Sequence, residues 1–358
     1  MPAENWIESL GRTLSADLGV DLGTSNARVV SRRTGEIHSA PSVVARCRRT
    51  GEVMAVGQNA VDLCARLPET IEEVRPLRDG AIADYDGAMV LLRALVLHAR
   101  NHLAPRRPRV VISVPCELTQ VQRRALVSAA KGAGAREVFL LAAPMAAALG
   151  AGIPAALRGG KLVIDVGSHT TEVAVVTFSG VVHARTMRMG GAKLDEAIRT
   201  WLKRKLDVEV GIAQARTLKE TLGCALPRTD HRDVCIDARD RVTGALRVVR
   251  VKAEELREAL APAVTQLVDA VRTVIENAPP EFSADIAQNG IVLAGGGARL
   301  DGLAELLMRE LRLPVSVAKD PVTAGVAGCG SCLERLDLLR DLRLEARAQS
   351  PTLEASFA

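Results

Sequence analysis

Aromatic side chains are scarce in this chain of 358 residues, which has four Phe, two Trp and one Tyr. Proteins that bind single-stranded nucleic acid without sequence preference stack the bases on such rings. The scarcity therefore argues against that class of protein. The net charge of +5 is also modest and gives no strong reason to expect a polyanion as partner. We expect no nucleic-acid ligand.

A disulfide framework is absent as well, because the seven cysteines show no regular spacing and their number is odd. No secretory signal peptide is recognisable, so we expect free thiols in a reducing cytoplasm. Cys329 and Cys332 form a C-x-x-C pair, but no second pair and no flanking His completes a zinc site. We expect these two thiols to be buried or incidental rather than metal ligands.

A strongly apolar membrane-spanning run is also missing, although the segment 138–157 carries no charged residue. Ala and Gly dominate this segment, and it contains Pro144 and Pro154, so its tendency to enter a bilayer is weak. We expect a short strand at 138–141 and a helix of small residues after Pro144.

The chain does contain a hydrophobic fraction of 48%, enough for two core-bearing lobes at this length. A strand at 18–20 leads into the turn 21–26, and a second strand returns from it. The same pattern recurs 144 residues later, with a strand at 162–164, a turn at 165–171 and a returning strand at 172–178. Both turns begin with Asp-x-Gly. The repetition predicts an internally duplicated fold with one unit in each lobe.

Hydrophobic periodicity predicts the other elements that organise the two lobes. A strand at 109–114, an amphipathic helix at 119–130 and a strand at 137–141 form a β–α–β unit. No long linker or low-complexity tract occurs, so the lobes are expected to be joined by short crossings near 150 and 320. The second half is expected to contain helices at 195–206, 254–276 and about 300–311, and a strand at 291–294.

Three glycine-containing turns follow hydrophobic strands, at Gly23-Thr24, Gly167-Ser168 and Gly295-Gly296-Gly297. Turns of this kind expose backbone N–H groups and allow a phosphate to approach the chain closely. Asp21 and Asp165 each precede the glycine of their turn by two residues, and a carboxylate beside a phosphate site suits hydrated Mg²⁺. The three turns together predict a nucleotide bound between the lobes.

Further stretches carry a family resemblance, among them Arg-Pro-Leu-Arg-Asp-Gly-Ala-Ile-Ala-Asp-Tyr at 75–85 and Pro-Met-Ala-Ala-Ala at 144–148. With these, the chain resembles the actin superfamily, and specifically the bacterial actin family of MreB and its Mbl-type paralogues. The resemblance runs in collinear order from about residue 17 to residue 330. The matching stretches are 21–26, 40–45, 71–85, 114–115, 122–125, 132–141, 144–148, 170–175, 190–191, 195–198, 295–298 and 320–323.

The resemblance implies an α/β, actin-like duplicated two-lobe fold with four subdomains and a nucleotide cleft between the lobes. Lobe I would cover 16–150 with a small subdomain at about 42–86, and lobe II would cover 151–319 with a small subdomain at about 195–255. The other expected parts are an N-terminal amphipathic segment at 1–15, a C-terminal segment at 320–345 that returns to lobe I, and a disordered tail at 346–358.

The resemblance also implies an ATP- or ADP-binding protein that polymerises into filaments and organises cell-wall synthesis. Such a protein would lie in the cytoplasm at the inner face of the cell membrane. Its expected partners are further copies of the chain, a paralogous bacterial actin, the membrane surface and the cell-wall synthesis machinery. Asp21 and Asp165 would bind Mg²⁺, and Gln122, Asp165 and Glu172 are the candidate catalytic residues. The residues expected at the nucleotide are Asp21, Gly23, Thr24, Ser25, Asn26, Gly167, Ser168, His169, Thr170, Gly190, Gly191, Lys219, Glu220, Gly295, Gly296, Gly297 and Ala298.

Gln122 stands where the family usually has a Glu. A neutral amide can orient an attacking water but cannot act as a general base. Thr119-x-x-Gln122 also forms a capping box for its helix, a role that needs no nucleotide. Both interpretations stay open from the sequence.

The second phosphate turn departs from the family pattern Gly-Gly-Gly-Thr, because it reads Gly167-Ser168-His169-Thr170. His169 adds bulk beside the expected γ-phosphate and disfavours a positive φ, which predicts weakened contact with a triphosphate. The alternatives are a side chain that points outward or one that donates to phosphate when protonated. Lys219 is retained near the adenosine, but Thr221 replaces the usual Glu and Glu220 lies beside it. We expect slow or absent ATP hydrolysis.

Two segments are candidates for membrane contact. The N-terminal stretch places Trp6 and three aliphatic residues on one helical face, typical of a helix at a membrane interface. Glu4 and Glu8 oppose anionic lipid, so a frayed or protein-docked terminus is the alternative. The second candidate is a loop near 101–108. At the other end, apolar residues repeated over 333–342 predict a packed final helix.

Two competing functions remain from the sequence. A paralogue that binds nucleotide but hydrolyses it poorly would co-assemble with a competent bacterial actin. A small-molecule kinase of the same superfamily would need a further catalytic Asp and a polar substrate pocket. The collinear match over 75–85 and 132–148 is to the cytoskeletal branch.

Overall fold

The computed structural model describes residues 17–99, 107–154, 159–177, 179–228 and 232–334. The amphipathic segment expected at 1–15, most of the loop at 101–108 and the residues after 334 lie outside the described residues. The predictions for the membrane helix, for the final helix and for the tail are therefore not addressed by the fold.

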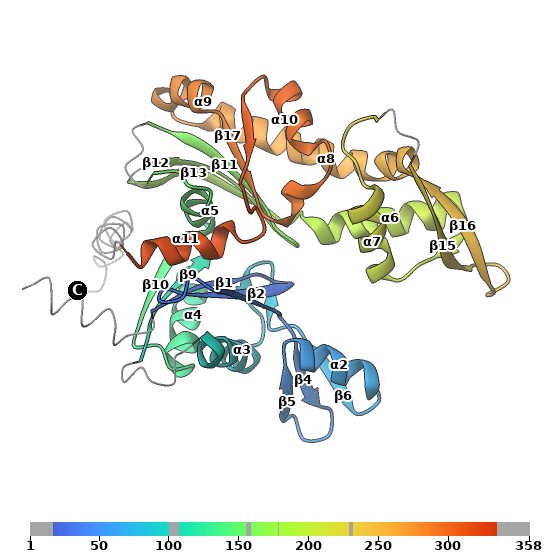
Figure 1. Ribbon diagram of the computed structural model, residues 1–358, viewed down its shortest axis with the longest axis horizontal. Coiled ribbons are helices and arrows are strands. Elements are labelled where there is room, and N and C mark those ends of the chain that lie inside the picture. Colours follow the sequence, from blue (N-terminus) through green and yellow to red (C-terminus); the bar gives the residue numbers. More distant parts are fainter. Residues whose placement is uncertain (1–16, 100–106, 155–158, 178, 229–231, 335–358) are drawn as a thin grey trace, which may run out of the picture.

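The first of two five-stranded sheets is built around the first Asp-x-Gly turn (Figure 1). Strand β1 (Leu18–Leu22) pairs antiparallel with β2 (Asn26–Ser31) across this turn, and parallel with β9 (Arg109–Val114). Strand β3 (Ile37–Pro41) extends the sheet antiparallel beyond β2, and β10 (Glu137–Ala142) extends it parallel beyond β9. Leu18, Val20 and Leu22 of β1 are buried in the core of the first half, and Asp21 alternates with them near the end of the strand.

The second sheet repeats this topology around the second Asp-x-Gly turn. Strand β11 (Lys161–Val166) pairs antiparallel with β12 (Thr171–Thr177) and parallel with β17 (Ile291–Ala294). Strand β13 (Gly180–Met187) lies antiparallel beyond β12, and β18 (Val315–Val317) lies parallel beyond β17. The matching strand orders confirm the internal duplication that the repeated turns predict.

The first half also carries a three-stranded sheet at an outer end of the molecule (Figure 1). It consists of β4 (Val44–Cys47), β5 (Val53–Val56) and β6 (Ile71–Val74), and α2 (Gln58–Arg66) packs against it. The next segment forms a short hairpin of β7 (Leu77–Arg78) and β8, whose bounds are Ala81–Ile82.

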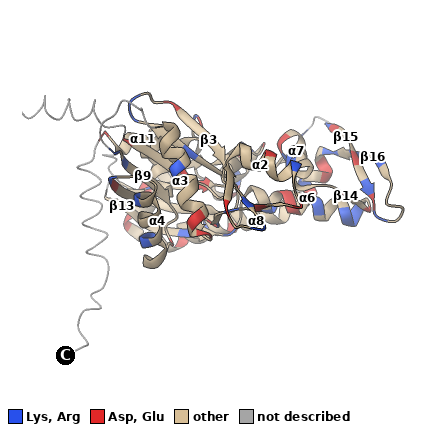
Figure 2. Cartoon of the chain, turned by 90° about the horizontal axis from the view of Figure 1, so that it is seen from below, with Lys and Arg blue, Asp and Glu red and all other residues tan. Residues whose placement is uncertain are grey.

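The second half carries a corresponding arm. Its sheet contains β14 (Val208–Glu209), β15 (Asp233–Asp240) and β16 (Leu246–Lys252), and it adjoins α6 (Gly191–Lys205) and α7 (Ile212–Leu222). Figure 2 shows that basic and acidic residues are interspersed along this arm. Several ion pairs connect its elements, so the charges are balanced locally and do not form a patch of one sign.

Helices cover the outer face of each large sheet. In the first half, α3 (Tyr85–Ala99) and α4 (Gln120–Gly132) contribute to one core with β1, β2, β9 and β10. In the second half, α8 (Ala253–Asn277), α9 (Ser283–Asn289) and α10 (Leu303–Leu311) contribute to a core with β11, β12 and β17. The strands at 109–114, 137–141 and 291–294 and the helices at 119–130 and 254–276 are thus confirmed to within two residues at their ends.

Two helices begin elsewhere than the periodicity predicts. Helix α6 starts at Gly191 and not near 195, because the N–H groups of Gly191 and Ala192 bond to the carbonyls of Gly167 and Ser168 at 3.0 and 2.7 Å. These contacts draw the start of the helix toward the second Asp-x-Gly turn. Helix α10 starts later than 300 because residues 296–299 form a separate 3₁₀ turn. A second 3₁₀ turn spans 280–282.

The two large sheets are held together by a pair of helices that lie between them (Figure 1). Helix α5 (Ala143–Gly150) and helix α11 (Ala324–Cys332) belong to a core cluster that includes residues of β9, β10, β11 and β12. Helix α5 follows β10 directly, which confirms the strand and small-residue helix predicted for the uncharged segment. Within the described ranges, no helix has both the length and the apolar character that a membrane crossing requires.

Glycines allow α5 and α11 to touch backbone to backbone. A Cβ added at Gly328 would lie 1.8 Å from the carbonyl oxygen of Ala146, and one at Gly150 would lie 1.8 Å from that of Ala324. Neither obstacle is a side chain that could turn away. The separation of the sheets therefore depends on the absence of side chains at these two positions.

We predict that Gly328→Ala destabilises the protein by about 2 kcal/mol, because the helices must move apart. Helix propensity alone would favour Ala by about 1 kcal/mol, so a net loss isolates the steric effect. The free energy of unfolding in urea measures it. Gly325→Ala in the same helix is the matched control, because the nearest atom to a Cβ there lies at an ordinary van der Waals distance of 3.6 Å. A Gly328→Ala variant as stable as the wild type would contradict the close contact.

Candidate functional site

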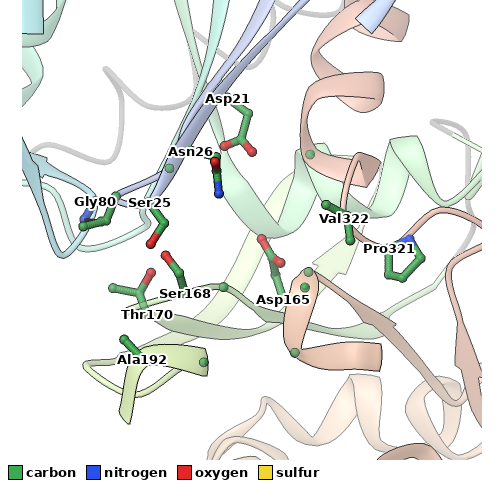
Figure 3. A pocket seen from close by; sticks show the side chains of 18 of the residues that line it. Asp21, Ser25, Asn26, Gly80, Asp165, Ser168, Thr170, Ala192, Pro321 and Val322 are labelled. Carbon is green, nitrogen blue, oxygen red and sulfur yellow. Dashed lines mark hydrogen bonds between the residues drawn. The ribbon is translucent and has the colours of Figure 1, made fainter. Parts of the chain in front are cut away.

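A cavity of about 560 Å³ lies where the ends of β1 and β11 converge (Figure 3). All three glycine-containing turns line it, as the sequence predicts. The predicted site residues on its wall are Asp21, Gly23, Thr24, Ser25, Asn26, Asp165, Gly167, Ser168, Thr170, Glu172, Gly191, Lys219, Glu220, Gly295, Gly296 and Gly297. Gln122, His169, Gly190 and Ala298 do not line it.

The two aspartates point into the cavity from facing strand ends (Figure 3). Burial raises the pKa of Asp165 to about 7, and the nearby carboxylates of Asp21 and Glu172 add to this effect. Burial also raises the pKa of Asp21, although the Arg28 guanidinium opposes the shift. The cavity therefore holds concentrated negative charge that would favour a cation.

Glu172 is buried and its carboxylate is already engaged. Oε2 accepts a hydrogen bond from the Cys116 backbone N–H at 3.1 Å, and Oε1 accepts one from the Thr186 hydroxyl at 2.7 Å. Cys116 follows β9 of the first sheet, whereas Glu172 and Thr186 belong to the second sheet. Glu172 thus ties the two halves together beside the cavity, and its predicted catalytic role stays a prediction.

The glycines of the third turn permit a close approach of backbone to Asp165. Gly295 has φ +80°, and a Cβ there would lie 2.3 Å from the Val166 carbonyl oxygen and 2.4 Å from Asp165 Oδ1. A Cβ at Gly297 would lie 2.2 Å from Val166 Cγ1. Only glycine fits these positions, because a side chain would displace the aspartate or fill the cradle.

The first turn is held from outside by polar contacts. The Ser42 hydroxyl donates to the Gly23 carbonyl at 2.6 Å, and the Gly80 N–H donates to the Thr24 hydroxyl at 3.1 Å. Gly80 belongs to the β7–β8 turn, so that hairpin contacts the first Asp-x-Gly turn. Ser42 is fully buried. The turn is therefore fixed before any ligand enters.

Lys219 reaches the cavity from α7 and is oriented by Asp195 of α6. Its Nζ lies 2.5 Å from Asp195 Oδ1 and 3.0 Å from the Gly191 carbonyl oxygen. Arg216 pairs with the other oxygen of the same carboxylate at 3.4 Å. Thr221, which replaces the Glu of the family pattern, donates its hydroxyl to the Thr217 carbonyl at 2.8 Å. Glu220 and not Thr221 lines the cavity.

Gln122 forms the capping box that its spacing allows. Its side-chain Oε1 accepts a hydrogen bond from the Thr119 backbone N–H at 2.9 Å, and its backbone N–H donates to the Thr119 hydroxyl at 3.2 Å. The residue lines a small separate hollow with Gly80 and Leu126. The capping interpretation is confirmed, and orientation of an attacking water by Gln122 stays a prediction.

His169 does not narrow the cavity as the sequence suggests. Its backbone φ is not positive, so the turn needs no glycine at this position. Its Nδ1 lies 3.1 Å from the Ser168 hydroxyl, and the side chain is absent from the cavity wall. This agrees with the alternative in which the ring points outward. Burial lowers the pKa of His169, which favours the neutral ring.

The donor set fits Mg²⁺ bound together with a nucleotide better than Mg²⁺ bound by protein alone. Among the described residues, no group of three or more His, Cys, Asp or Glu side chains is arranged as a metal site. Asp21 and Asp165 supply two carboxylates, whereas both oxygens of Glu172 already accept a hydrogen bond from the protein. Mg²⁺ commonly takes one or two carboxylates and completes its shell with water and phosphate oxygens. The cavity has room for a nucleotide and a Mg²⁺ ion together.

Several wall residues were not assigned to the site from the sequence. They are Leu22, Arg28, Gly80, Ser113, Pro115, Ala143, Ala192, Leu194, Asp195, Arg216, Arg299, Leu300, Pro321, Val322 and Gly325. Some of them lie in stretches that carry the family resemblance, which was the signal that could have found them: Leu22, Gly80, Pro115, Asp195, Pro321 and Val322. Arg28 had none, because a lone Arg on a strand indicates nothing about its neighbours.

Comparison with known sequences gives a consistent result. The sequence model of the MreB/Mbl protein family matches residues 15–341. The cell shape-determining protein MreB of Escherichia coli (strain K12) is 41% identical to this chain over 330 residues, which cover 90% of this chain and 95% of that protein.

Solved structures share the fold. The crystal structure of MreB5 of Spiroplasma citri bound to AMPPNP is similar with a TM-score of 0.83 and 29% identity, covering 92% of this chain and 98% of that chain. A MamK double helical filament gives a TM-score of 0.74 at 25% identity, covering 88% of this chain and 98% of that chain. These neighbours confirm the α/β, actin-like duplicated two-lobe fold.

We predict a pH-dependent gain in stability for Asp165→Asn in the absence of nucleotide and metal. Between about pH 4 and pH 7 the folded protein keeps the Asp165 proton that the unfolded chain has released, so the free energy of unfolding of the wild type falls as pH rises. Asn cannot ionise. Relative to the wild type, the variant should gain on the order of 2 kcal/mol from pH 5 to pH 8, a value reduced for access of water to the cavity.

Urea unfolding in the presence of a chelator measures this difference. Asp233→Asn is the control, because the Arg250 guanidinium holds the pKa of Asp233 below its ordinary value. Asp233 is charged in the folded and the unfolded state above pH 5. The difference in free energy of unfolding between Asp233→Asn and the wild type should therefore stay constant with pH. If the difference between Asp165→Asn and the wild type is also constant with pH, the ionised form of Asp165 is not destabilised in the cavity.

Proposed function

The chain belongs to the MreB/Mbl protein family, and from this premise we propose that it is an ATP-binding, actin-like protein that assembles into filaments and organises cell-wall synthesis and cell shape. The observation that carries the proposal is the cavity in which the two duplicated Asp-x-Gly turns face each other. In this arrangement, backbone N–H groups and carboxylates of both halves would surround one bound nucleotide.

We assign the parts of the cavity to the parts of a nucleotide. The turns at 23–26 and 167–170 would bind the phosphates, because exposed backbone N–H groups suit anions. Asp21 and Asp165 would hold Mg²⁺, which supplies charge neutralisation for the phosphates when bound. Lys219, Glu220 and the turn 295–297 would border the adenosine. The crystal structure of Spiroplasma citri MreB5 bound to AMPPNP supports an adenine nucleotide as the ligand.

Further copies of the same chain are the proposed main partner. MamK, which shares the fold, forms a double helical filament, and the Escherichia coli relative is named a cell shape-determining protein. A nucleotide that bridges both halves offers a physical link between its state and the geometry of the subunit. The proposal extends to contact with the cell-wall synthesis machinery at the inner face of the cell membrane.

Assembly is expected to require an occupied cavity. Purified chain incubated with ATP and Mg²⁺ should sediment at high speed and show filaments by electron microscopy. Gly295→Ala should bind ATP about 10- to 100-fold more weakly, because strain of about 1–3 kcal/mol falls on Asp165 and the turn. Its sedimentation should fall in parallel. Gly35→Ala is the control, because Gly35 has a similar φ of +68° but no atom within 4 Å of a new Cβ.

The proposal fails if the wild type neither binds ATP nor sediments under these conditions. Binding without sedimentation, followed by sedimentation when a bacterial actin paralogue is added, would instead favour a co-assembling subunit. Equal ATP affinity of Gly295→Ala and Gly35→Ala would contradict the assigned position of the third turn.

Attachment to the membrane is proposed through the N-terminal segment 1–15, which lies outside the described residues. Trp6→Ala should lower co-sedimentation with vesicles of mixed zwitterionic and anionic lipid by about tenfold, because burial of a large aromatic ring contributes about 2 kcal/mol. Trp6→Phe should retain most of the binding. Unchanged co-sedimentation of Trp6→Ala would exclude this anchor.

A further inference from the structure

The two duplicated hairpins carry side chains of opposite charge at equivalent positions that face the shared cavity. In the β1–β2 hairpin the residue paired with Asp21 is Arg28, whereas in the β11–β12 hairpin the residue paired with Asp165 is Glu172. Paired residues on antiparallel strands project to the same face. One hairpin therefore presents a carboxylate beside a guanidinium cation, and the other presents two carboxylates.

Arg28 lies among these carboxylates. Its Nη1 is 3.5 Å from Asp21 Oδ2, its side chain is 16% exposed, and it lines the cavity. In the part of the chain that the structure describes, Arg28 is the cation that pairs with either of the two aspartates. A guanidinium has five N–H donors in a fixed plane, so one edge can contact Asp21 while others point to a ligand.

The other cations on the cavity wall are placed differently. Lys219 and Arg216 are both paired with Asp195, on the side of the cavity formed by α6 and α7. Arg299 is exposed beyond the third turn. Arg28 is thus the cation positioned where the two aspartates converge, which is where the phosphates would lie.

The formal charges of this region show what Arg28 changes. Asp21, Asp165 and Glu172 together carry three negative charges when ionised, and Arg28 offsets one of them. The remainder equals the charge of one divalent cation. Without Arg28, phosphates that enter in the absence of metal would face three uncompensated carboxylates.

We propose that Arg28 is a resident phosphate-binding cation that holds the phosphates beside Asp21 and so makes nucleotide binding less dependent on a divalent cation. Guanidinium groups bind phosphate through paired, charge-assisted hydrogen bonds, which gives the contact direction as well as charge. The proposal rests on the proposed nucleotide site and concerns how that site retains its ligand.

The test compares ATP affinity in excess Mg²⁺ with that in excess EDTA, by calorimetric titration of the full-length chain. The wild type should lose less than about tenfold in affinity when the metal is removed. Arg28→Leu should lose about 10- to 100-fold more in EDTA than the wild type does, because a charge-assisted contact to phosphate is gone. Arg28→Lys keeps the charge without the planar fork and should lie between them.

Arg33→Leu is the matched control, because Arg33 is exposed beyond the end of β2 and its loss changes the net charge equally. The ratio of its ATP affinity in Mg²⁺ to that in EDTA should equal the ratio of the wild type. Thermal unfolding without ligand checks that each variant is folded, and Arg28→Gln replaces Arg28→Leu if the latter is not.

Two results overturn the proposal, and they are distinguishable. If the wild type binds no ATP even in Mg²⁺, the nucleotide function itself fails. If ATP binds in Mg²⁺ but the ratio of affinities is the same in the wild type, Arg28→Leu and Arg33→Leu, the nucleotide site stands and the role of Arg28 is rejected.

Discussion

Two carboxylates that end the central strands of two sheets share one cavity, and the other contacts of the molecule keep them there. Because α5 and α11 lie between the sheets in direct backbone contact, the ends of β1 and β11 converge and Asp21 faces Asp165. Burial raises the pKa of both groups, and the nearby Asp21 carboxylate adds to the rise at Asp165. The folded protein therefore carries an electrostatic penalty in its centre that a bound cation with phosphates would relieve.

The duplication explains how such a site arises, and its asymmetry explains how the site is tuned. Each half supplies a strand, an Asp-x-Gly turn and a returning strand, so the same arrangement of exposed backbone N–H groups, which suits an anion, occurs twice. The position opposite the aspartate differs, however. Arg28 neutralises part of the charge in the first half, whereas Glu172 in the second half is committed to Cys116 and Thr186 and joins the halves. Equivalent positions of the repeat thus serve binding in one lobe and cohesion in the other.

Local sequence rules predicted the parts of the site that depend on backbone conformation. The glycine turns, the aspartates before them and the capping box of Gln122 follow from residues close together in the chain, and each has the predicted form. Predictions that needed the direction of a side chain were less secure. His169 was expected beside the phosphates, but its backbone needs no positive φ and its ring does not line the cavity.

The sequence by itself determined the duplicated hairpins, the residues of the three turns and the membership of the family, because these depend on short-range pattern and collinear motifs. Only the tertiary structure decided that Asp195 orients Lys219, that Ser42 and Gly80 fix the first turn, and that Arg28 lies at the aspartates. The strand register pairs Asp21 with Arg28, but the packing of α5 against α11 decides which residues of the second half these two side chains face. Such contacts join residues distant in the chain, and no local pattern records them.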